Sequence, residues 1–262
     1  MFFFRITGFL KYLLFARHAG GHGIHSPFVF NLVSEVFRNK TDAAIVFKIE
    51  NLRRKCLSSS SVVNVVDLGR GSGKFKRNTR KVSDIAKYSA IPRKYGILLS
   101  SLAAEFGKTE ILELGTSLGI SSMYLAAGAP HARVYTVEGS PGTSEVAREI
   151  FREGDFGNIS LINASFDDAL ESLSISGLHP GLVFIDGDHR KEPLLRYFKQ
   201  LAGMSSDTTA VVIDDIHLSP EMEEAWDEIK QHPKVTVTAD IYRMGLVFFR
   251  KGVNRSDYVI RY

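Results

Sequence analysis

The sequence predicts an α/β protein built around one mostly parallel sheet. From residue 108 onward, short apolar runs of strand length alternate with longer segments whose apolar residues recur at helical spacing. Several of these runs end in glycine or in an acidic residue, which is typical of strands that lead into a ligand-binding edge. Alternation of this kind indicates βαβ units, whose strands lie parallel.

The clearest unit spans residues 108–125, KTEILELGTSLGISSMYL. It consists of a short buried strand that carries Glu113, a glycine turn, and a helix that begins near Ile120. We expect Gly115 and Gly119 to let a ligand approach the backbone where a Cβ would clash. The helix start offers unpaired N–H groups and the positive end of the helix dipole. This turn is therefore the predicted centre of a site for a nucleotide-like ligand.

The segments around this unit support that prediction. Residues 85–90 and 94–106 are expected to form helices ahead of it. After it, a strand at 134–137 ends in Glu138, which follows Gly115 by 23 positions. An acidic side chain at that distance is placed to accept hydrogen bonds from ribose hydroxyls.

Two later strands run into clusters of acidic residues. The strand at 182–185 leads into Asp186, and the strand at 210–213 leads into Asp214 and Asp215. Parallel strands deliver these side chains to one edge of the sheet, where hard oxygen ligands on rigid elements suit a divalent cation. Aspartate is also a favoured N-cap of a following helix, which is the alternative explanation.

The remaining elements complete the sheet. A helix at 145–151 and a strand at 159–162 precede the acidic strands, and closely spaced strands at 235–238 and 243–249 follow them. The short connection between the last two indicates that the final strand is antiparallel. The predicted fold is a Rossmann-like, seven-stranded, mostly parallel sheet with an antiparallel last strand, plus a helical N-terminal extension.

The N-terminal region is basic, whereas the rest of the chain is acidic. Residues 1–94 hold 18 Lys and Arg against 5 Asp and Glu, a net charge of +13, and the remainder has a net charge of −9. This asymmetry indicates an anionic partner, or docking of the two regions on each other or on a second subunit. We divide the chain into a substrate cap or dimerisation region at 1–92 and a main domain at 93–262. The single cysteine, Cys56, excludes an internal disulfide and suits the cytoplasm.

Residues 1–15 are apolar at helical spacing but are interrupted by Arg5 and Lys11. The stretch is too short and too charged to span a bilayer, and it lacks the cleavage site of a secretory signal. We expect it to pack on the main domain, to form part of a homodimer interface, or to lie on a membrane surface.

Two other N-terminal features have less specific interpretations. His18, His22 and His25 lie close together, but glycines surround them and no cysteine or acidic residue is nearby, so a metal site there is disfavoured. The serine–proline helix start that follows them favours a loop lining a substrate pocket. Residues 62–73 resemble a second strand and glycine turn, but a basic segment follows, so we interpret them as an extended segment and a basic loop.

Seven short segments occur in order between about residues 93 and 251: PRKYGILL, ELGTSLGIS, VEGSP, NASFDDAL, FIDGDH, VIDDIH and MGLVFFRK. Together they resemble the motifs of class I S-adenosylmethionine-dependent methyltransferases, and more narrowly those of catechol and caffeoyl-CoA O-methyltransferases. The resemblance implies S-adenosylmethionine as the cofactor. It implies cofactor contacts by Gly96, Glu113, Gly115, Thr116, Ser117, Gly119, Ser121, Glu138, Gly139, Ser165, Phe166 and Asp186.

The resemblance also implies a divalent cation, Mg²⁺ or a similar ion, on Asp186, Asp214 and Asp215. Methyl transfer is an in-line displacement from a sulfonium to an oxygen, and a cation would lower the pKa of the reacting hydroxyl. His189 stands where such enzymes often carry lysine, and Asp215 stands where they often carry asparagine. Because a histidine side chain ordinarily titrates near pH 6.5, His189 is the candidate general base, with Asp186 as the second catalytic residue.

We therefore expect metal-assisted O-methylation of a small-molecule or lipid-linked hydroxyl. An RNA (tRNA) methyltransferase that uses the basic N-terminal region is one alternative, although the sequence has no recognisable RNA-reading module. A protein that binds the cofactor without catalysis is another, and the intact acidic cluster argues against it. Nothing in the sequence identifies the methyl acceptor.

Overall fold

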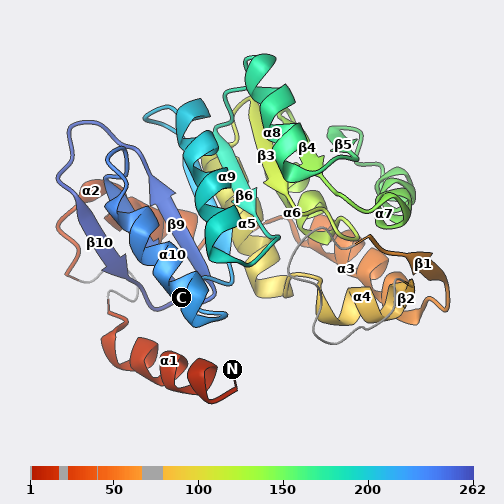
Figure 1. Cartoon of the computed structure of the whole chain (residues 1–262), viewed down its shortest axis with the longest axis horizontal. Coiled ribbons are helices and arrows are strands. Elements are labelled where there is room, and N and C mark those ends of the chain that lie inside the picture. Colours follow the sequence, from red (N-terminus) through yellow and green to blue (C-terminus); the bar gives the residue numbers. More distant parts are fainter. Residues whose placement is uncertain (1, 18–22, 40, 67–78) are drawn as a thin grey trace.

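The fold is organised around one eight-stranded sheet with the strand order β10-β8-β9-β7-β6-β3-β4-β5 (Figure 1). The computed structural model describes residues 2–17, 23–39, 41–66 and 79–262. The strands are β3 (Glu110–Leu114), β4 (Arg133–Val137), β5 (Ile159–Ile162), β6 (Leu182–Ile185), β7 (Ala210–Asp214), β8 (Val237–Asp240), β9 (Met244–Phe248) and β10 (Ser256–Val259).

The predicted sheet is confirmed, with one additional strand. Strands β3 to β7 pair parallel, and β9 is antiparallel to both β7 and β8. The strand that the sequence did not predict is β10, which pairs parallel with β8 at the outer edge. Its sequence, SDYV, contains only two apolar residues, so the local pattern does not distinguish it from a loop.

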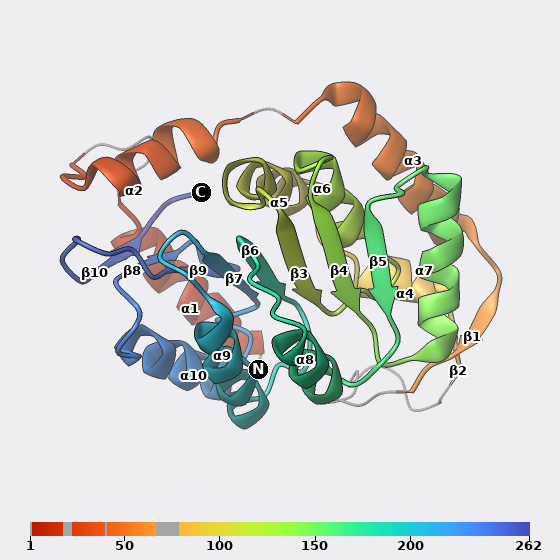
Figure 2. The ribbon, with the colours of Figure 1, turned by 90° about the horizontal axis from the view of Figure 1, so that it is seen from above.

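Helices cover both faces of the sheet (Figure 2). Side chains alternate along each strand, so that Ile111 of β3 faces one hydrophobic cluster and Leu112 faces the other. The first cluster packs under α5 (Arg93–Phe106), α6 (Ile120–Gly128) and α7 (Pro141–Glu153). The second packs under α8 (Phe166–Ile175), α9 (Lys191–Met204) and α10 (Pro220–Gln231).

Most of the described N-terminal region packs onto the first cluster. Buried residues of α2 (Pro27–Asn31), the π-helical turn η2 (Leu32–Val36), α3 (Ala43–Ser58) and α4 (Val82–Tyr88) lie in the same hydrophobic cluster as α5 and α6. The Ser26 hydroxyl accepts a hydrogen bond from the Val29 N–H at 3.4 Å, as expected for the N-cap of α2. A short antiparallel pair, β1 (Val62–Asn64) and β2 (Thr79–Lys81), completes this region. The boundary between residues 92 and 93 stays a prediction.

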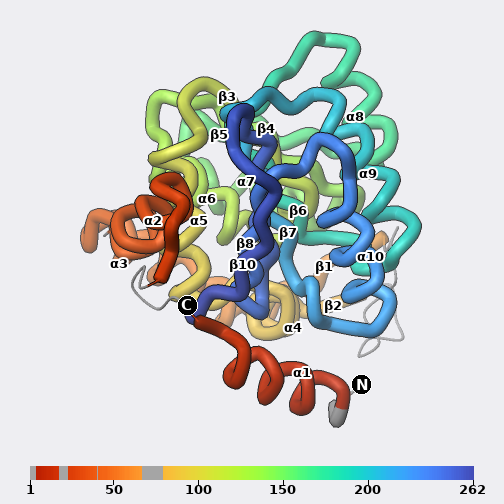
Figure 3. Tube along the Cα trace, turned by 90° about the vertical axis from the view of Figure 1, so that its left-hand side faces the viewer, coloured from red at the N-terminus to blue at the C-terminus, as the bar shows by residue number. Residues whose placement is uncertain are grey.

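Helix α1 (Phe2–Phe15) stands apart from the other N-terminal helices, beside the chain's C-terminus (Figure 3). The Tyr12 hydroxyl donates to the Ile260 carbonyl oxygen at 2.7 Å, and the Tyr242 hydroxyl donates to the Arg5 carbonyl oxygen at 2.6 Å. None of the described helices is long and apolar enough to cross a membrane. Large apolar side chains on α1 are nevertheless exposed, namely Ile6, Phe9, Leu10, Leu13, Leu14 and Phe15.

Two predicted features of this region fall outside the described residues. They are His18 and His22, and the glycine loop from Asp67 to Gly73 with the basic residues that follow it to Arg77. His25 is described and is exposed.

Candidate active site

The glycine turn after β3 is held closely against the end of β6. Gly115 has φ +110°, and a Cβ there would lie 2.0 Å from the Asp186 carbonyl oxygen. Gly119 has φ +79°, and a Cβ there would lie 2.2 Å from the Phe151 ring. Both positions therefore require glycine because of the protein's own packing. This packing reason differs from the approach of a ligand that the sequence suggested.

Glu113 is fully buried beneath the start of α6. Its Oε2 accepts hydrogen bonds from the Ser122 hydroxyl and, at 2.5 Å, from the Thr136 hydroxyl. Within the described part of the chain, its Oε1 has no hydrogen-bond partner. Burial raises the pKa of Glu113 to about 7, although the nearby hydroxyl groups of Ser121, Ser122 and Thr136 oppose that rise. The turn therefore contains a buried acceptor that a cationic or N–H group of a ligand would satisfy.

Glu138 joins the glycine turn to the turn after β4. Its Oε2 accepts the Ser117 N–H and its Oε1 accepts the Ser140 N–H, both at 2.9 Å. Ser117 has φ +48°, an uncommon conformation for a residue other than glycine, and Glu138 helps to hold it there. Gly139 lies between these two anchors and is partly buried. Each carboxylate oxygen can accept a further hydrogen bond, so ribose hydroxyls remain suitable partners for Glu138.

The NASFDDAL segment, which the resemblance implies lies on the adenine side of the cofactor, lies against the loop that follows β6. The Ser165 hydroxyl caps α8 by accepting the Asp168 N–H at 3.2 Å, and it donates to the Asp168 carboxylate at 2.6 Å. A Cβ at Gly187 would lie 2.7 Å from the Phe166 ring, which places that ring directly beside the loop. Phe166 also packs edge-on against Tyr197, with a centroid distance of 5.6 Å. Its ring is thus held in position by protein contacts on two sides.

Two other predicted cofactor residues have clear packing roles. Gly96 on α5 faces α6, and a Cβ there would lie 2.4 Å from the Tyr124 ring. The Thr116 side chain is buried, and its hydroxyl lies 2.6 Å from the Thr136 hydroxyl. These contacts explain the two residue types without a ligand, and a cofactor contact by either residue stays a prediction.

The acidic edge contains a cation that the sequence analysis missed. Arg243 donates from Nε to Asp214 Oδ1 at 3.0 Å and from Nη2 to Asp214 Oδ2 at 2.6 Å. The same Nη2 lies 4.0 Å from Asp215 Oδ1. Arg243 directly precedes β9, whose first residue, Met244, pairs with Asp214 across the antiparallel ladder. The ion pair between Arg243 and Asp214 follows from the register of β9 against β7.

Arg243 conflicts with the predicted metal site on Asp186, Asp214 and Asp215. Both carboxylate oxygens of Asp214 are bonded to a guanidinium, and a second cation in the same place would be repelled by it. Among the described residues, no group of three or more His, Cys, Asp or Glu side chains is arranged to hold a metal ion. The residues present therefore do not fit the divalent cation that the resemblance implied.

The acidic side chains influence one another strongly. Burial, reinforced by the charge of Asp215, raises the pKa of Asp186 to about 7, and Arg243 opposes that rise. Burial and the charges of Asp186 and Asp215 also raise the pKa of Asp214, again against the effect of Arg243. Concentrating these carboxyl groups at one edge is unfavourable unless a cation balances them, and Arg243 supplies that balance.

The two residues predicted to be catalytic lie side by side. His189 Nε2 is 3.7 Å from Asp186 Oδ1, a separation too long for a hydrogen bond but short enough for a direct electrostatic effect. The His189 and Asp186 side chains are 25% and 17% exposed, so both can be reached from solvent.

Aromatic side chains flank Arg243 and were not identified from the sequence. The guanidinium lies over the Tyr95 ring, 5.6 Å from its centroid. Tyr95 in turn contacts Tyr262 at 5.8 Å between centroids, and the Lys94 ammonium lies 4.2 Å from the Tyr262 ring centroid. These residues come from the start of α5 and from the end of the chain, so only the folded structure brings them together.

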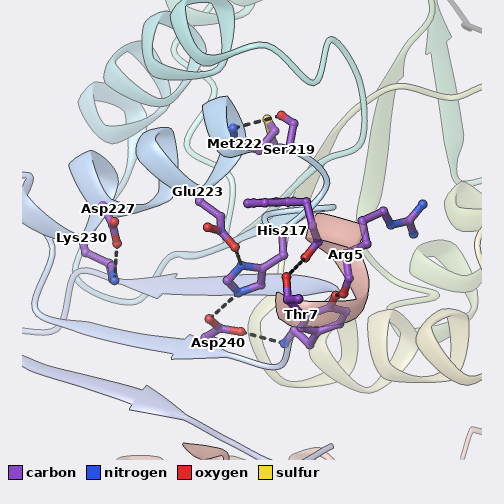
Figure 4. Close-up of polar contacts among 11 residues, drawn as sticks. Arg5, Thr7, His217, Ser219, Met222, Glu223, Asp227, Lys230 and Asp240 are labelled. Atoms are coloured by element: carbon purple, nitrogen blue, oxygen red, sulfur yellow. Dashed lines mark hydrogen bonds and ion pairs between the residues drawn. The ribbon is translucent and has the colours of Figure 1, made fainter. Parts of the chain in front are cut away.

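Helix α1, which carries Arg5 and Thr7, lies beside His217 (Figure 4). His217 lies between two carboxylates, with Nδ1 2.8 Å from Glu223 Oε1 and Nε2 2.8 Å from Asp240 Oδ2. Burial tends to lower the pKa of His217, but Asp240 and Glu223 outweigh it and raise that pKa. The imidazole stacks on the Tyr242 ring at 5.3 Å, and Tyr242 is the residue that binds the α1 backbone.

Comparisons with known proteins agree with this geometry. Residues 112–216 match the family described as "Methyltransferase domain". Catechol O-methyltransferase of Mycobacterium tuberculosis is 33% identical over 129 residues, which cover 48% of this chain and 57% of that protein. Catechol O-methyltransferase of Niastella koreensis is 32% identical over 124 residues, which cover 46% and 55% of the two chains. The chain thus spans little more than half the length of these curated relatives.

A solved structure extends the likeness to the whole fold. The O-methyltransferase from Bacillus cereus in complex with SAH superposes with a TM-score of 0.56 at 18% identity, covering 84% of this chain and 97% of that one. The chain is thus similar to S-adenosylmethionine-dependent O-methyltransferases over residues 112–216, and it shares the overall fold of a solved O-methyltransferase.

Proposed function

We propose that this chain is an S-adenosylmethionine-dependent O-methyltransferase. The observation that carries the proposal is the arrangement of acceptor groups along the carboxyl edge of β3, β4 and β6. Across the sheet these strands lie in the order β6, β3, β4, so Glu113 of β3 stands between Asp186, which follows β6, and Glu138, which follows β4. The Phe166 ring lies beside Gly187 in the loop after β6.

The residues present suit S-adenosylmethionine, which supplies an electrophilic methyl group on a positively charged sulfur. The ammonium group of its amino-acid end would meet Glu113, whose buried Oε1 lacks a partner among the described residues. Glu138 would accept from the ribose, and the ring of Phe166 offers an apolar face to the adenine. The acidic edge at Asp186 complements the positive sulfur.

His189 is the candidate base for the transfer. As the acceptor oxygen bonds to the methyl carbon, the carbon–sulfur bond breaks and the hydroxyl proton passes to the His189 imidazole. Asp186, 3.7 Å away, stabilises the imidazolium that results. Divalent-metal assistance, which the sequence analysis expected, is not part of this proposal because the acidic edge is already paired with Arg243.

The surroundings of the acidic edge favour an acceptor with apolar character, such as an aromatic or lipid-linked hydroxyl. The Arg243 guanidinium lies over the Tyr95 ring, and the Tyr262 ring contacts Tyr95. Helix α1, with its exposed apolar side chains, is anchored to Tyr242, the residue before Arg243. A steep loss of tRNA binding with added salt would instead favour the alternative of an RNA substrate.

Calorimetric titration with S-adenosylhomocysteine tests the cofactor part of the proposal. We expect the wild-type chain to bind, and Glu138→Ala to bind much more weakly because two turns lose their shared anchor. Glu145→Ala, at an exposed position on α7, is the matched control and should bind like the wild type. Absence of binding to the folded wild-type chain would refute the proposal.

Transfer of radiolabelled methyl groups from S-adenosylmethionine to a panel of phenols and lipid alcohols tests the chemistry. With the acceptor that this panel identifies, His189→Ala should lower kcat while leaving S-adenosylhomocysteine affinity nearly unchanged. His131→Ala, at an exposed site between α6 and β4, should leave both unchanged. Equal turnover in His189→Ala and wild type would remove His189 from the mechanism.

A further inference from the structure

We propose that Arg243 is the fixed cation of the acceptor site, so that methyl transfer in this protein needs no divalent metal. The inference rests on the proposed function, and it adds the residue that takes over the electrostatic task of a metal. It also predicts a property of the substrate, namely that the methyl acceptor need not chelate a cation.

The first argument is the position of the guanidinium. Arg243 binds Asp214 through two nitrogens, a bidentate geometry that fixes the planar group in one orientation. Asp214 is the last residue of β7 and Asp215 follows it, at the place where the sequence predicted metal ligands. The guanidinium thus occupies the side of the acidic cluster where a cation was expected.

The second argument is the difference in exposure within this ion pair. The Asp214 side chain is 0% exposed, whereas the Arg243 side chain is 27% exposed. Asp214 therefore acts as a buried anchor, and the guanidinium is the member of the pair that a substrate can reach. Its Nη1 makes no hydrogen bond within the described part of the chain, which leaves donors for an incoming oxygen.

Charge balance gives the same result. Arg243 forms ion pairs with both Asp214, at 2.6 Å, and Asp215, at 4.0 Å. A divalent ion added to this cluster would have to displace a guanidinium held by two hydrogen bonds.

These observations define the chemistry of the acceptor. A metal ion binds an acceptor best through two adjacent oxygens, whereas a guanidinium stabilises a single phenolate or alkoxide by donating hydrogen bonds. The hydroxyl proton still passes to His189, and the methyl group still moves from sulfur to oxygen. We therefore expect acceptors with one isolated hydroxyl to be methylated as readily as those with a vicinal pair.

Manganese binding, followed by the electron paramagnetic resonance signal of free Mn²⁺, tests the inference on the full chain. The wild type should bind no Mn²⁺ at the acidic edge, and Arg243→Ala should gain a site that a further Asp186→Asn substitution removes. Arg243→Lys, which keeps the charge, should remain without Mn²⁺. Binding of S-adenosylhomocysteine by each variant shows that its cofactor crevice has folded.

Two results would overturn the inference. One is Mn²⁺ binding by the wild type that Asp215→Asn abolishes, a readout that remains available even where Arg243→Ala does not fold. The other is loss of wild-type methyl transfer after chelation with recovery on adding Mg²⁺. Failure of the wild type to bind S-adenosylhomocysteine would instead refute the proposed function, so the two failures are distinguishable.

Discussion

Replacing Glu113 by glutamine should make the unfolding free energy of the protein less sensitive to rising pH. Glu113 is completely buried, and burial raises its pKa from 4.5 to about 7. The folded state therefore favours the neutral acid. Its stabilising contribution is fully present below pH 4.5 and is lost as the pH rises through 7, because the buried group must then ionise.

The size of the effect follows from the pKa shift. At about 1.36 kcal/mol per pKa unit, the shift corresponds to roughly 3 kcal/mol of unfolding free energy between the two ends of this pH range. Glutamine does not ionise, and its carbonyl oxygen can accept from Ser122 and Thr136 as the carboxyl group does. The variant should match the wild type below pH 4.5 and exceed it above pH 7.

Urea denaturation across this pH range, followed by circular dichroism, measures the difference. Every other titrating group is common to both proteins, so the difference between them isolates position 113. The exposed Glu145→Gln substitution serves as a control and should show no such pH dependence. A constant difference between Glu113→Gln and wild type at all pH values would refute the reasoning.

Three other substitutions test separate features. Arg243→Met should lower the unfolding free energy, measured by urea denaturation, by about 3–5 kcal/mol, since it leaves Asp214 buried and unpaired. Adding Asp214→Asn should restore much of that loss. If the double variant is no more stable than Arg243→Met, the ion-pair argument is contradicted. Gly115→Ala should abolish S-adenosylhomocysteine binding in calorimetry, because its Cβ would lie 2.0 Å from a carbonyl oxygen at the end of β6; unchanged affinity would mean that the turn can relax. Leu14→Asp, at a side chain that is 77% exposed on α1, should weaken sedimentation with anionic vesicles and leave the free energy of unfolding unchanged. An anionic membrane partner is contradicted if the variant and the wild type sediment equally with these vesicles. It is also contradicted if the wild type sediments equally with anionic and zwitterionic vesicles.

Much of the cofactor side of the site could be predicted from the sequence because its parts are local. The glycine turn, its preceding strand and the helix that follows form one continuous segment, so a strand pattern and two glycines suffice to locate it. Glu138 lies directly after the next strand in the chain, and parallel pairing of β3 with β4 brings it to the same edge. The Ser117 N–H that Glu138 accepts lies within the predicted turn.

The acceptor side could not be predicted in the same way. Arg243 and Asp214 are separated by 29 positions, and their contact depends on the register of β9 against β7. Nothing in the local pattern around the VIDDIH segment indicates that a guanidinium meets its first aspartate. The acidic residues alone suggested a metal site, because hard oxygen ligands are what both a metal ion and an arginine bind.

By itself, the sequence determined the α/β fold, the antiparallel strand β9 and the glycine turn after β3, since each follows from periodicity or from neighbours along the chain. The tertiary structure alone decided which cation balances the acidic edge, which aromatic rings surround it, and where α1 is anchored. Those contacts join segments that are distant in the chain, and their geometry is set by strand register and helix packing rather than by the order of residues within any one segment.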